Sequence, residues 1–394
     1  MKFLPFNVWL LMVVGAIAMT AAPMVVFCGG LIGAAIAPSA SLATLPVAIM
    51  VVGTATAVIP VTLLMQRVGR KPAFILGGLM SIGGALLSAF SVAQASFWGF
   101  CGGIFILGAG LAFVQQFRFA AMESVAPDDM ASAAARVLLG GLVAAYVGPE
   151  ITLESKDLLA TPYVGGFVIL AGLYLLSTLL LLLYKPTVMA VTQHTGTGRA
   201  LSTIAIQPVF LVAVLSAAVG YATMSFVMTA TPMSMHVDVG HSLADTKWVI
   251  QSHIMAMFIP SFFSGWLISR YGADKIMLSG LVAFVLCVVI AFYDQSLMNY
   301  WFALVLLGIG WNFLFVGGTS LLPQSYREEE KYKVQGFNEF FVFGIQAVAS
   351  LSSGWVLYTF GWEALLISCL PLLLIVLAAI VWWRKTSLFT RDAF

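Results

Sequence analysis

The chain has 394 residues, of which 61% are hydrophobic and only 9% are charged. An ordinary soluble domain carries about 25% charged residues, so this composition excludes a soluble globular protein and indicates an integral membrane protein. The net charge is only +2, and the charged residues are scattered along the chain. That distribution argues against nucleic-acid binding.

Apolar stretches of about 20 residues, separated by charges or by Pro, Gly and Asn, predict membrane-spanning helices. We predict twelve. The first six are 8–33, 42–65, 72–93, 97–121, 132–153 and 161–184; the second six are 205–233, 247–269, 273–293, 299–323, 334–359 and 363–384. The polar interval 185–204 predicts a cytoplasmic linker between an N-terminal six-helix bundle (1–184) and a C-terminal bundle with a short cytoplasmic tail (205–394).

Lys and Arg are retained in cytoplasmic loops, so their positions predict the orientation. With the N-terminus inside, only Lys156 and Lys247 fall in outer loops. The basic residues placed inside are Lys2, Arg67, Arg70, Lys71, Lys185, Arg199, Arg270, Lys275, Arg327, Lys331, Lys333, Arg384, Lys385 and Arg391. Both termini are therefore expected to be cytoplasmic.

The two halves repeat one another. MTAAPM at 19–24 recurs as MTATPM at 228–233, Ile59-Pro60 recurs as Ile259-Pro260, and Leu107-Gly108 recurs as Leu307-Gly308. Transporters are commonly built from internal repeats. The fold class that we predict is all-α and membrane-integral, with two pseudo-symmetric six-helix bundles.

Each hexapeptide contains a proline that lacks the amide needed to close a helical hydrogen bond. We expect Pro23 and Pro232 to bend helices 1 and 7 and to shape the outer mouth of a cavity. Thr20 and Thr229 precede them by three residues, where a hydroxyl can bond to the loosened backbone.

The pattern of six plus six spans, the central linker, and a basic loop after helices 2 and 8 resembles the major facilitator superfamily. Its loop motif, G-x-L-x-D-R-x-G-R-K, is present here as TLLMQRVGRK, with Arg67, Gly69, Arg70 and Lys71 retained and Gln66 at the acidic position. The second copy, GWLISRYGADK, retains Arg270 and Gly272. The resemblance implies a rocker-switch carrier with a central cavity lined mainly by helices 1, 4, 7 and 10. It also implies a multi-pass protein of the bacterial inner membrane.

Ionisable side chains inside a bilayer are costly, and they are therefore functional candidates. Arg118 in helix 4 and Glu339 in helix 11 are both expected in the inner third of the membrane. We predict that they pair when the cytoplasmic side closes. The alternative is that Arg118 reaches lipid phosphates and Glu339 is hydrated.

Glu150 at the end of helix 5 and His253 in helix 8, two residues after Gln251, form a second candidate pair. A carboxylate beside an imidazole would titrate where a proton gradient can act on it. We interpret them as coupling residues. The alternative is an interfacial Glu150 and a structural, hydrogen-bonded His253.

Uncharged polar and aromatic side chains are candidates for ligand binding in an otherwise apolar cavity. They are Gln115, Tyr146, Tyr221, Trp311, Asn312, Gln335 and Asn338. For the aromatic residues, simple packing is the alternative. Two further groups have a structural interpretation that suffices: the glycines Gly77-Gly78, Gly83-Gly84, Gly102-Gly103, Gly108, Gly110 and Gly140-Gly141 for close helix packing, and the cysteines Cys28, Cys101, Cys287 and Cys369 as small buried hydrophobes.

We predict a secondary active transporter, coupled to protons, and not an enzyme, because the chain has neither a phosphate-binding loop nor a hydrolase motif. Few charges lie in the spans, which favours a neutral or amphiphilic organic substrate over a polyanion. The family resemblance suggests a vitamin such as riboflavin, a siderophore or a drug-like compound. A passive facilitator is the alternative, and a membrane-embedded enzyme or a non-transporting sensor is a remote one. We expect a monomer in contact with lipid, with no metal, cofactor or nucleic acid bound.

Overall fold

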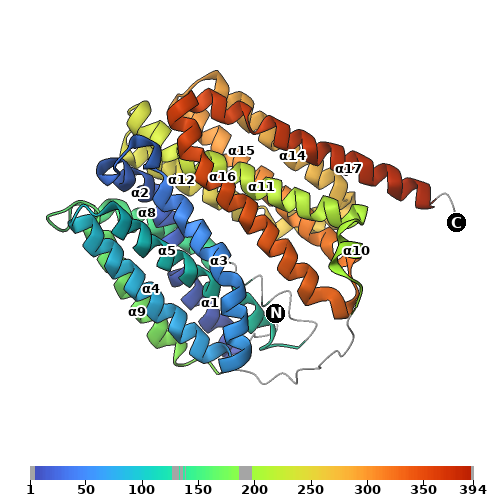
Figure 1. Ribbon diagram of the computed structural model, residues 1–394, viewed down its shortest axis with the longest axis horizontal. Helices are drawn as coiled ribbons and strands as arrows, with labels where there is room; N and C mark the ends of the chain where they lie inside the picture. Colours follow the sequence, from blue (N-terminus) through green and yellow to red (C-terminus); the bar gives the residue numbers. More distant parts are fainter. Residues whose placement is uncertain (1–4, 127–132, 134–135, 138, 186–197, 392–394) are drawn as a thin grey trace. The chain divides into compact units, whose positions relative to one another are not determined.

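The computed structural model describes residues 5–126, 133, 136–137, 139–185 and 198–391, and in these ranges every regular element is a helix (Figure 1). The predicted all-α class is therefore confirmed. The chain divides into two compact units, with Met1–Val191 and Met235–Gln251 in unit 1 and with Thr192–Ser234 and Ser252–Phe394 in unit 2. Most of the predicted linker, residues 186–197, lies outside the described residues.

Unit 1 is built from eight described α-helices and the beginning of α12. They are α1 (Phe6–Ala18), α2 (Ala21–Ile36), α3 (Leu45–Val68), α4 (Arg70–Ala93), α5 (Phe97–Val114), α6 (Phe117–Met122), α8 (Gly140–Glu154) and α9 (Val164–Leu181). In unit 2 the helices are α10 (Leu201–Ala205), α11 (Pro208–Pro232), α13 (Ser261–Tyr271), α14 (Ala273–Tyr293), α15 (Leu297–Leu321), α16 (Lys331–Ile367) and α17 (Leu370–Arg391). Helix α12 (Leu243–Phe258) begins in unit 1 and ends in unit 2.

Nine stretches of the described residues are long and apolar enough to cross a membrane, or ten if the bent pair of α12 and α13 is one span. The last stretch, Lys333–Thr386, is 54 residues long, more than twice the roughly 20 residues that a bilayer needs. Within it, Gly361 has a φ of +84°, a left-handed conformation that glycine adopts without strain and that turns the chain. The twelve-helix count stays a prediction.

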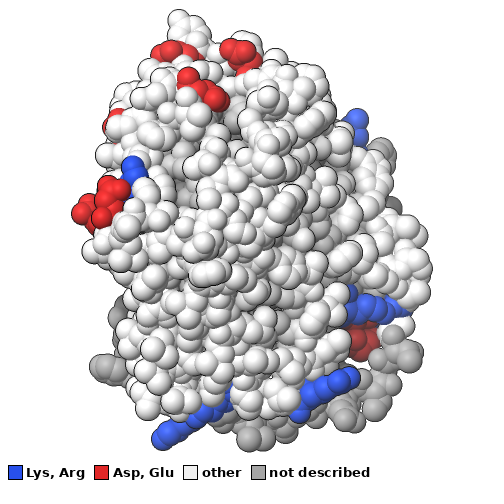
Figure 2. Space-filling view, turned by 60° about the vertical axis from the view of Figure 1, so that its left-hand side comes forward, with Lys and Arg blue, Asp and Glu red and all other residues white. Residues whose placement is uncertain are grey.

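Exposed apolar side chains identify the surface that faces lipid. On α4 they include Leu76, Leu79, Leu86 and Phe90, and on α14 they include Val282, Val285, Leu286 and Val289. Most of the face drawn in Figure 2 is uncharged, and the charged side chains lie toward its margins. Such an uncharged surface is favourable in hydrocarbon and unfavourable in water.

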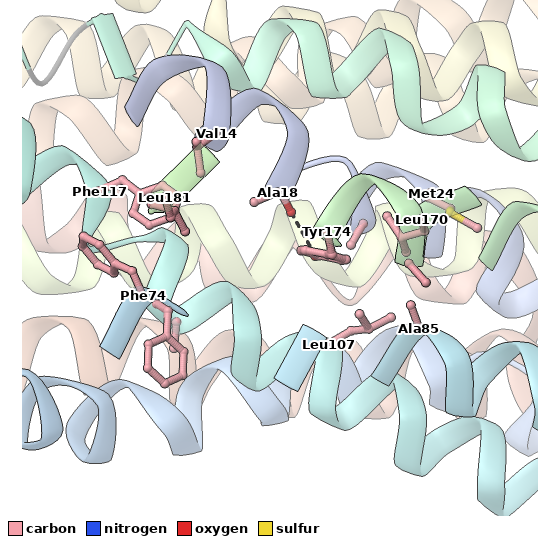
Figure 3. Close-up of a cluster of buried hydrophobic side chains, with 14 of the residues drawn as sticks. Val14, Ala18, Met24, Phe74, Ala85, Leu107, Phe117, Leu170, Tyr174 and Leu181 are labelled. Carbon is pink, nitrogen blue, oxygen red and sulfur yellow. Dashed lines mark hydrogen bonds between the residues drawn. The ribbon is translucent and has the colours of Figure 1, made fainter. Parts of the chain in front are cut away.

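The core of unit 1 is mainly apolar, and Figure 3 draws one of its buried polar contacts. The Tyr174 hydroxyl of α9 donates a hydrogen bond of 3.0 Å to the carbonyl oxygen of Ala18, where α1 ends. That carbonyl has lost its helical partner, because the amide of Ala22 bonds instead to Met19. Buried carbonyl groups need a donor, so Tyr174 stabilises the break between α1 and α2.

The two hexapeptides bend their helices in different ways. In the first copy, the helix is interrupted between α1 and α2, just before Pro23, and the Thr20 hydroxyl bonds to the carbonyl oxygen of Ala16 at 3.0 Å. In the second copy, Pro232 is the last residue of α11, and a π-helical turn, Met233–Asp238, follows it. Both interruptions agree with the predicted bends, whereas their role at a cavity mouth stays a prediction.

Glycines at matching positions let helices approach closely in both units. A Cβ on Gly108 of α5 would lie 2.1 Å from the carbonyl oxygen of Met50 on α3, and one on Gly308 of α15 would lie 2.7 Å from that of His253 on α12. Distances under 3 Å cannot be accommodated without movement, so these glycines hold equivalent helix crossings. By contrast, a Cβ on Gly83 or Gly102 would meet nothing within 4 Å, and close packing does not explain those two.

Candidate functional site

Four aromatic rings from three helices of unit 2 form one cluster. Trp311 stacks on Phe315, also on α15, with ring centroids 5.2 Å apart and an interplanar angle of 14°. Tyr221 of α11 meets Trp311 edge-on at 5.1 Å, and it meets Phe343 of α16 at 5.7 Å. The cluster therefore contains both aromatic residues, Tyr221 and Trp311, that the sequence predicts on helices 7 and 10.

Polar side chains continue along the contact between α11 and α16. Gln346 Nε2 donates to Ser225 Oγ at 2.8 Å, and the hydroxyls of Thr229 and Ser350 lie 2.9 Å apart. The partners advance by four residues on both helices, so α11 and α16 run parallel, as the seventh and eleventh spans of the predicted topology must. Gln346 was not among the predicted site residues; its spacing of four from Ser350 on an apolar helix was the available signal.

Several buried polar atoms in unit 2 have no hydrogen-bond partner. They include Nε1 of Trp311, Oε1 of Gln346, and the hydroxyls of Ser216 and Thr223. Ser216 and Thr223 are seven residues apart, on one stripe of α11, and Tyr221 lies on a different stripe. Trp311 and Gln346, by contrast, belong to the aromatic cluster and to the polar contact between α11 and α16.

The side chain of Asn312 makes hydrogen bonds on both sides of the bend between α12 and α13. Its Nδ2 donates to the carbonyl oxygen of Met257 at 2.8 Å and to Ser261 Oγ at 2.6 Å, and its Oδ1 accepts from Ser264 Oγ at 2.7 Å. The two helices meet at an angle of 42°. Both the nitrogen and the oxygen of its amide therefore have structural partners, which argues against a role for Asn312 in ligand binding.

The remaining candidates in unit 2 have separate surroundings. Gln335 Nε2 donates to the Tyr326 hydroxyl at 3.0 Å. Asn338 and Glu339 are half-buried on α16. His253 is fully buried, and its Nδ1 lies 2.7 Å from the carbonyl oxygen of Leu304 on α15. The structure therefore does not bring these residues into one group.

Glu150 pairs with a lysine. Lys247 Nζ lies 2.8 Å from Glu150 Oε2, and Gln251 Nε2 donates to Glu150 Oε1 at 3.4 Å and to the carbonyl oxygen of Tyr146 at 2.9 Å. The pairs run in opposite directions along α8 and α12, so these helices are antiparallel. The carboxylate of Glu150 therefore contacts Lys247 and Gln251 within unit 1. Its pairing with His253, which belongs to unit 2, stays a prediction. Tyr146 is 56% exposed, and its carbonyl group accepts from Gln251.

Gln115 and Arg118 lie where helix 4 is interrupted. Helix α5 ends at Val114, Gln115 is its C-terminal cap, and α6 begins at Phe117. The Arg118 guanidinium lies 4.7 Å from the ring centroid of Phe119, a cation–π contact. Arg118 belongs to unit 1 and Glu339 to unit 2, and their pairing stays a prediction.

The loop after helix 2 has an ion pair that the motif did not indicate. Gly69 adopts a φ of +82° between α3 and α4, which explains why glycine stands there. The Arg70 guanidinium binds both carboxylate oxygens of Glu123, with Nε to Oε2 at 2.5 Å. Lys71 Nζ donates to the carbonyl oxygen of Leu182 at 2.6 Å, and Arg67 is exposed. Glu123 thus supplies the negative charge that the motif lacks.

The second copy of the loop connects the corresponding helices through a different kind of contact. Gly272 has a φ of +92° between α13 and α14. Asp274, at the start of α14, lies 3.1 Å from Arg384 of α17, whereas in unit 1 the corresponding contact joins a lysine on α4 to the end of α9. Arg270 lies 5.5 Å from the ring centroid of Trp266. The two copies of the loop therefore connect corresponding helices, but through chemically different contacts.

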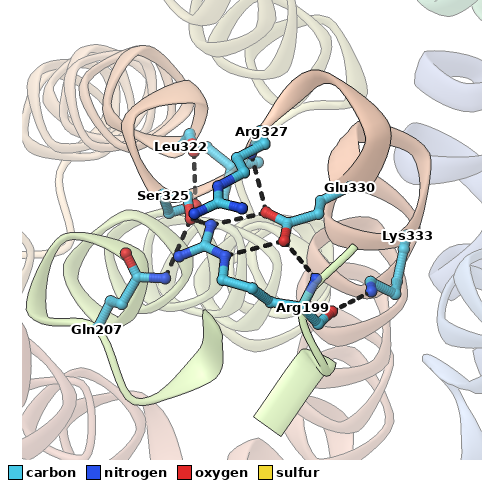
Figure 4. A network of polar contacts seen from close by, with 7 residues as sticks. All are labelled: Arg199, Gln207, Leu322, Ser325, Arg327, Glu330 and Lys333. Carbon is cyan, nitrogen blue, oxygen red and sulfur yellow. Dashed lines mark hydrogen bonds and ion pairs between the residues drawn. The ribbon is translucent and has the colours of Figure 1, made fainter. Parts of the chain in front are cut away.

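A network centred on Glu330 ties Arg199 to the segment between α15 and α16 (Figure 4). The Glu330 side chain is inaccessible to solvent, and its Oε1 accepts from the Arg199 amide at 2.6 Å and from Arg199 Nε at 2.8 Å. Its Oε2 accepts from the Arg199 guanidinium at 2.7 Å and from the Arg327 amide at 2.9 Å. These hydrogen bonds, above all those from Arg199, hold the pKa of Glu330 well below its usual range.

Comparison with known proteins assigns the family. The model of the Major Facilitator Superfamily matches residues 213–393, and the Sugar (and other) transporter model matches residues 7–188. The riboflavin transporter RfnT of Brucella anthropi is 36% identical over 378 residues, 95% of each chain. The chain belongs to the major facilitator superfamily.

Other relatives agree. An uncharacterized transporter of this superfamily from Bacillus subtilis, YddS, is 28% identical over 91% of this chain and 86% of its own. A variant of the nucleoside transporter NupG superposes with a TM-score of 0.75 at 12% identity, over 96% of this chain and 99% of that one. FucP superposes with a TM-score of 0.63 at 18% identity, over 96% and 98%. These two structures share the fold.

Membership of the superfamily makes the chain a multi-pass membrane transporter of a small molecule and not an enzyme. The sequence alone identified Tyr221 and Trp311 in the aromatic cluster of unit 2. It missed Gln346, Lys247 and Glu123, because which side chain meets which depends on how neighbouring helices are rotated.

Proposed function

We propose that this transporter carries riboflavin or a closely related flavin. The 36% identity with a riboflavin transporter, across 95% of both chains, carries the proposal. The aromatic cluster of Tyr221, Trp311, Phe315 and Phe343 supports it, because flat rings stack on aromatic side chains. None of these side chains is charged, which suits a neutral heteroaromatic substrate.

We further propose that transport is coupled to protons and proceeds by rocker-switch alternating access in the bacterial inner membrane, with the protein acting as a monomer. Glu150 is the first coupling candidate, because a proton on its carboxylate would remove the charge that holds Lys247 at 2.8 Å. His253 is the second, because its ring is buried with Nδ1 against the Leu304 carbonyl oxygen and with Nε2 unpartnered.

Purified protein in proteoliposomes tests the substrate and the coupling together. We expect labelled riboflavin to accumulate above its equilibrium concentration when a pH gradient is imposed, and a protonophore to abolish that accumulation. Equilibration without accumulation would identify a passive facilitator. If riboflavin did not move while a siderophore or a drug-like compound did, the assignment of a flavin substrate would be wrong.

The coupling residues are tested by neutral substitutions. Glu150→Gln and His253→Asn are each expected to reduce gradient-driven accumulation while riboflavin still exchanges between the two sides at equal pH, because the substrate path is intact. Full accumulation in both variants would refute the assignment of coupling to this pair.

A further inference from the structure

Two buried polar atoms beside the aromatic cluster of unit 2 lack partners. The indole Nε1 of Trp311 is a donor, and Oε1 of Gln346 is an acceptor, and neither makes a hydrogen bond with any of the described residues. The Trp311 side chain is only 4% exposed. Buried polar groups in native proteins are nearly always paired, so an unpaired donor and an unpaired acceptor beside the same aromatic cluster call for an explanation. A ligand that supplies both partners is one.

The amide of Gln346 lies on the same side of α16 as the aromatic cluster. Gln346 follows Phe343 by three residues, and residues at that spacing share a helix face. Its partner, Ser225, follows Tyr221 by four residues on α11, a rise of about 6 Å. Because Tyr221 contacts Phe343 and Ser225 contacts Gln346, the amide sits about one helical turn along from the stacked rings.

The hydrogen bond to Ser225 fixes the Gln346 amide but leaves part of its hydrogen-bonding capacity unused. Nε2 of Gln346 carries two hydrogens, and the 2.8 Å contact with Ser225 Oγ uses one. A second donor and a free acceptor, Oε1, therefore remain side by side. That pair complements an imide edge, in which an N–H lies next to a carbonyl group. Trp311, one turn away, adds a lone donor for a carbonyl oxygen or a ring nitrogen.

We propose that Gln346 recognises the imide edge of the substrate ring and that Trp311 donates to a second acceptor on the same ring, with the aromatic cluster packing against its faces. The assignment rests on the proposed function, because a flavin combines a flat aromatic body with a single pyrimidinedione edge at one end. Gln346 thereby determines specificity, while Trp311 contributes affinity irrespective of that edge.

The test compares riboflavin with its N3-methyl derivative, which keeps the ring and loses the imide N–H. The wild-type protein is expected to have a KM for riboflavin roughly tenfold lower than for the methylated flavin, since losing one ordinary hydrogen bond weakens binding by about that factor. Gln346→Met, of similar length and without hydrogen-bonding groups, raises the KM for riboflavin and brings the two values within about twofold of each other. The matched control is Gln94→Leu, an exposed glutamine at the end of α4, which keeps the preference.

Trp311→Phe is the second variant, and it keeps the proposal testable if Gln346→Met folds poorly. It keeps an aromatic ring and removes the N–H, so both KM values rise by the same factor and the preference for riboflavin remains. Binding to purified protein, followed by quenching of flavin fluorescence, reports the same ratios without transport. An undiminished preference in Gln346→Met, or a preference lost in Trp311→Phe instead, overturns the assignment while leaving flavin transport intact. If the wild type binds neither flavin, the proposed function itself fails.

Discussion

Gly108 is a position where one added methyl group should destabilise the fold. On α5 its missing side chain lets α3 approach so closely that an added Cβ would lie 2.1 Å from the Met50 carbonyl oxygen. The Thr54 hydroxyl of α3 also donates to the Gly108 carbonyl oxygen at 2.9 Å. Gly102, on the same helix, would meet nothing within 4 Å. Gly108→Ala and Gly102→Ala are therefore the same chemical change in opposite surroundings.

The expected magnitudes follow from these distances. Each alanine gains about 1 kcal/mol of helix propensity over glycine. At Gly108, the helices must separate by roughly 1 Å, which costs about 1–3 kcal/mol by analogy with overpacked cores. The separation also weakens the Thr54 hydrogen bond, at about 1 kcal/mol. Gly108→Ala is thus expected to lose about 1–3 kcal/mol of folding free energy, whereas Gly102→Ala gains about 1 kcal/mol.

The measurement is the thermal unfolding midpoint of each purified variant in the same detergent. For a chain of this size, about 2 °C per kcal/mol places the two variants about 4–8 °C apart. Gly308→Ala is expected between them, because its Cβ would lie 2.7 Å from the His253 carbonyl oxygen. Equal midpoints for Gly108→Ala and Gly102→Ala would refute the claim that this helix crossing depends on the missing side chain.

Three further predictions concern ion pairs and bends. Neutralising either Glu150 or Lys247 should destabilise the protein, and a double-mutant cycle should give a coupling free energy of about 1 kcal/mol. Additive effects of the two substitutions would mean that the ion pair contributes nothing to stability. Because the pKa of Glu330 is lowered from 4.5 in the folded state, its stabilising contribution is complete above that pH and is lost as the pH falls toward the lowered value. The difference in melting temperature between wild type and Glu330→Gln should accordingly shrink in acid, and a constant difference would contradict this. Replacing Pro23 and Pro232 together with Ala should reduce transport rate more than protein yield, and an unchanged rate would show that the bends are not needed for transport.

Much of the architecture is encoded locally. Membrane insertion follows from composition, and span positions follow from runs of apolar residues, because transfer of each segment into hydrocarbon depends on its own side chains. The duplication is visible in matched residues such as Leu107-Gly108 and Leu307-Gly308. Tyr221 and Trp311 could be placed on cavity helices because the family resemblance specifies which helices line the cavity.

Which side chain pairs with which is not determined by the local sequence, and Glu150 illustrates this. The sequence predicted a titratable site with His253, whereas in the structure Lys247 contacts the carboxylate, since Lys247 and Gln251 are one turn apart on α12 and face Tyr146 and Glu150 on α8. That choice depends on the rotation of two helices about their axes. A sequence read one span at a time does not contain it.

The difference between what the sequence determines and what the tertiary structure determines is clearest at Ile59-Pro60 and Ile259-Pro260. The sequence by itself established that the two dipeptides are equivalent, and that a proline removes one backbone donor in each helix. Only the tertiary structure decided the outcome: α3 continues through Pro60, whereas the other copy breaks into α12 and α13 at 42°. The reason lies on α15, where Asn312 bonds to the freed carbonyl of Met257 and to Ser261. At the corresponding position of α5 stands Ala112, which has no polar group to hold a break open.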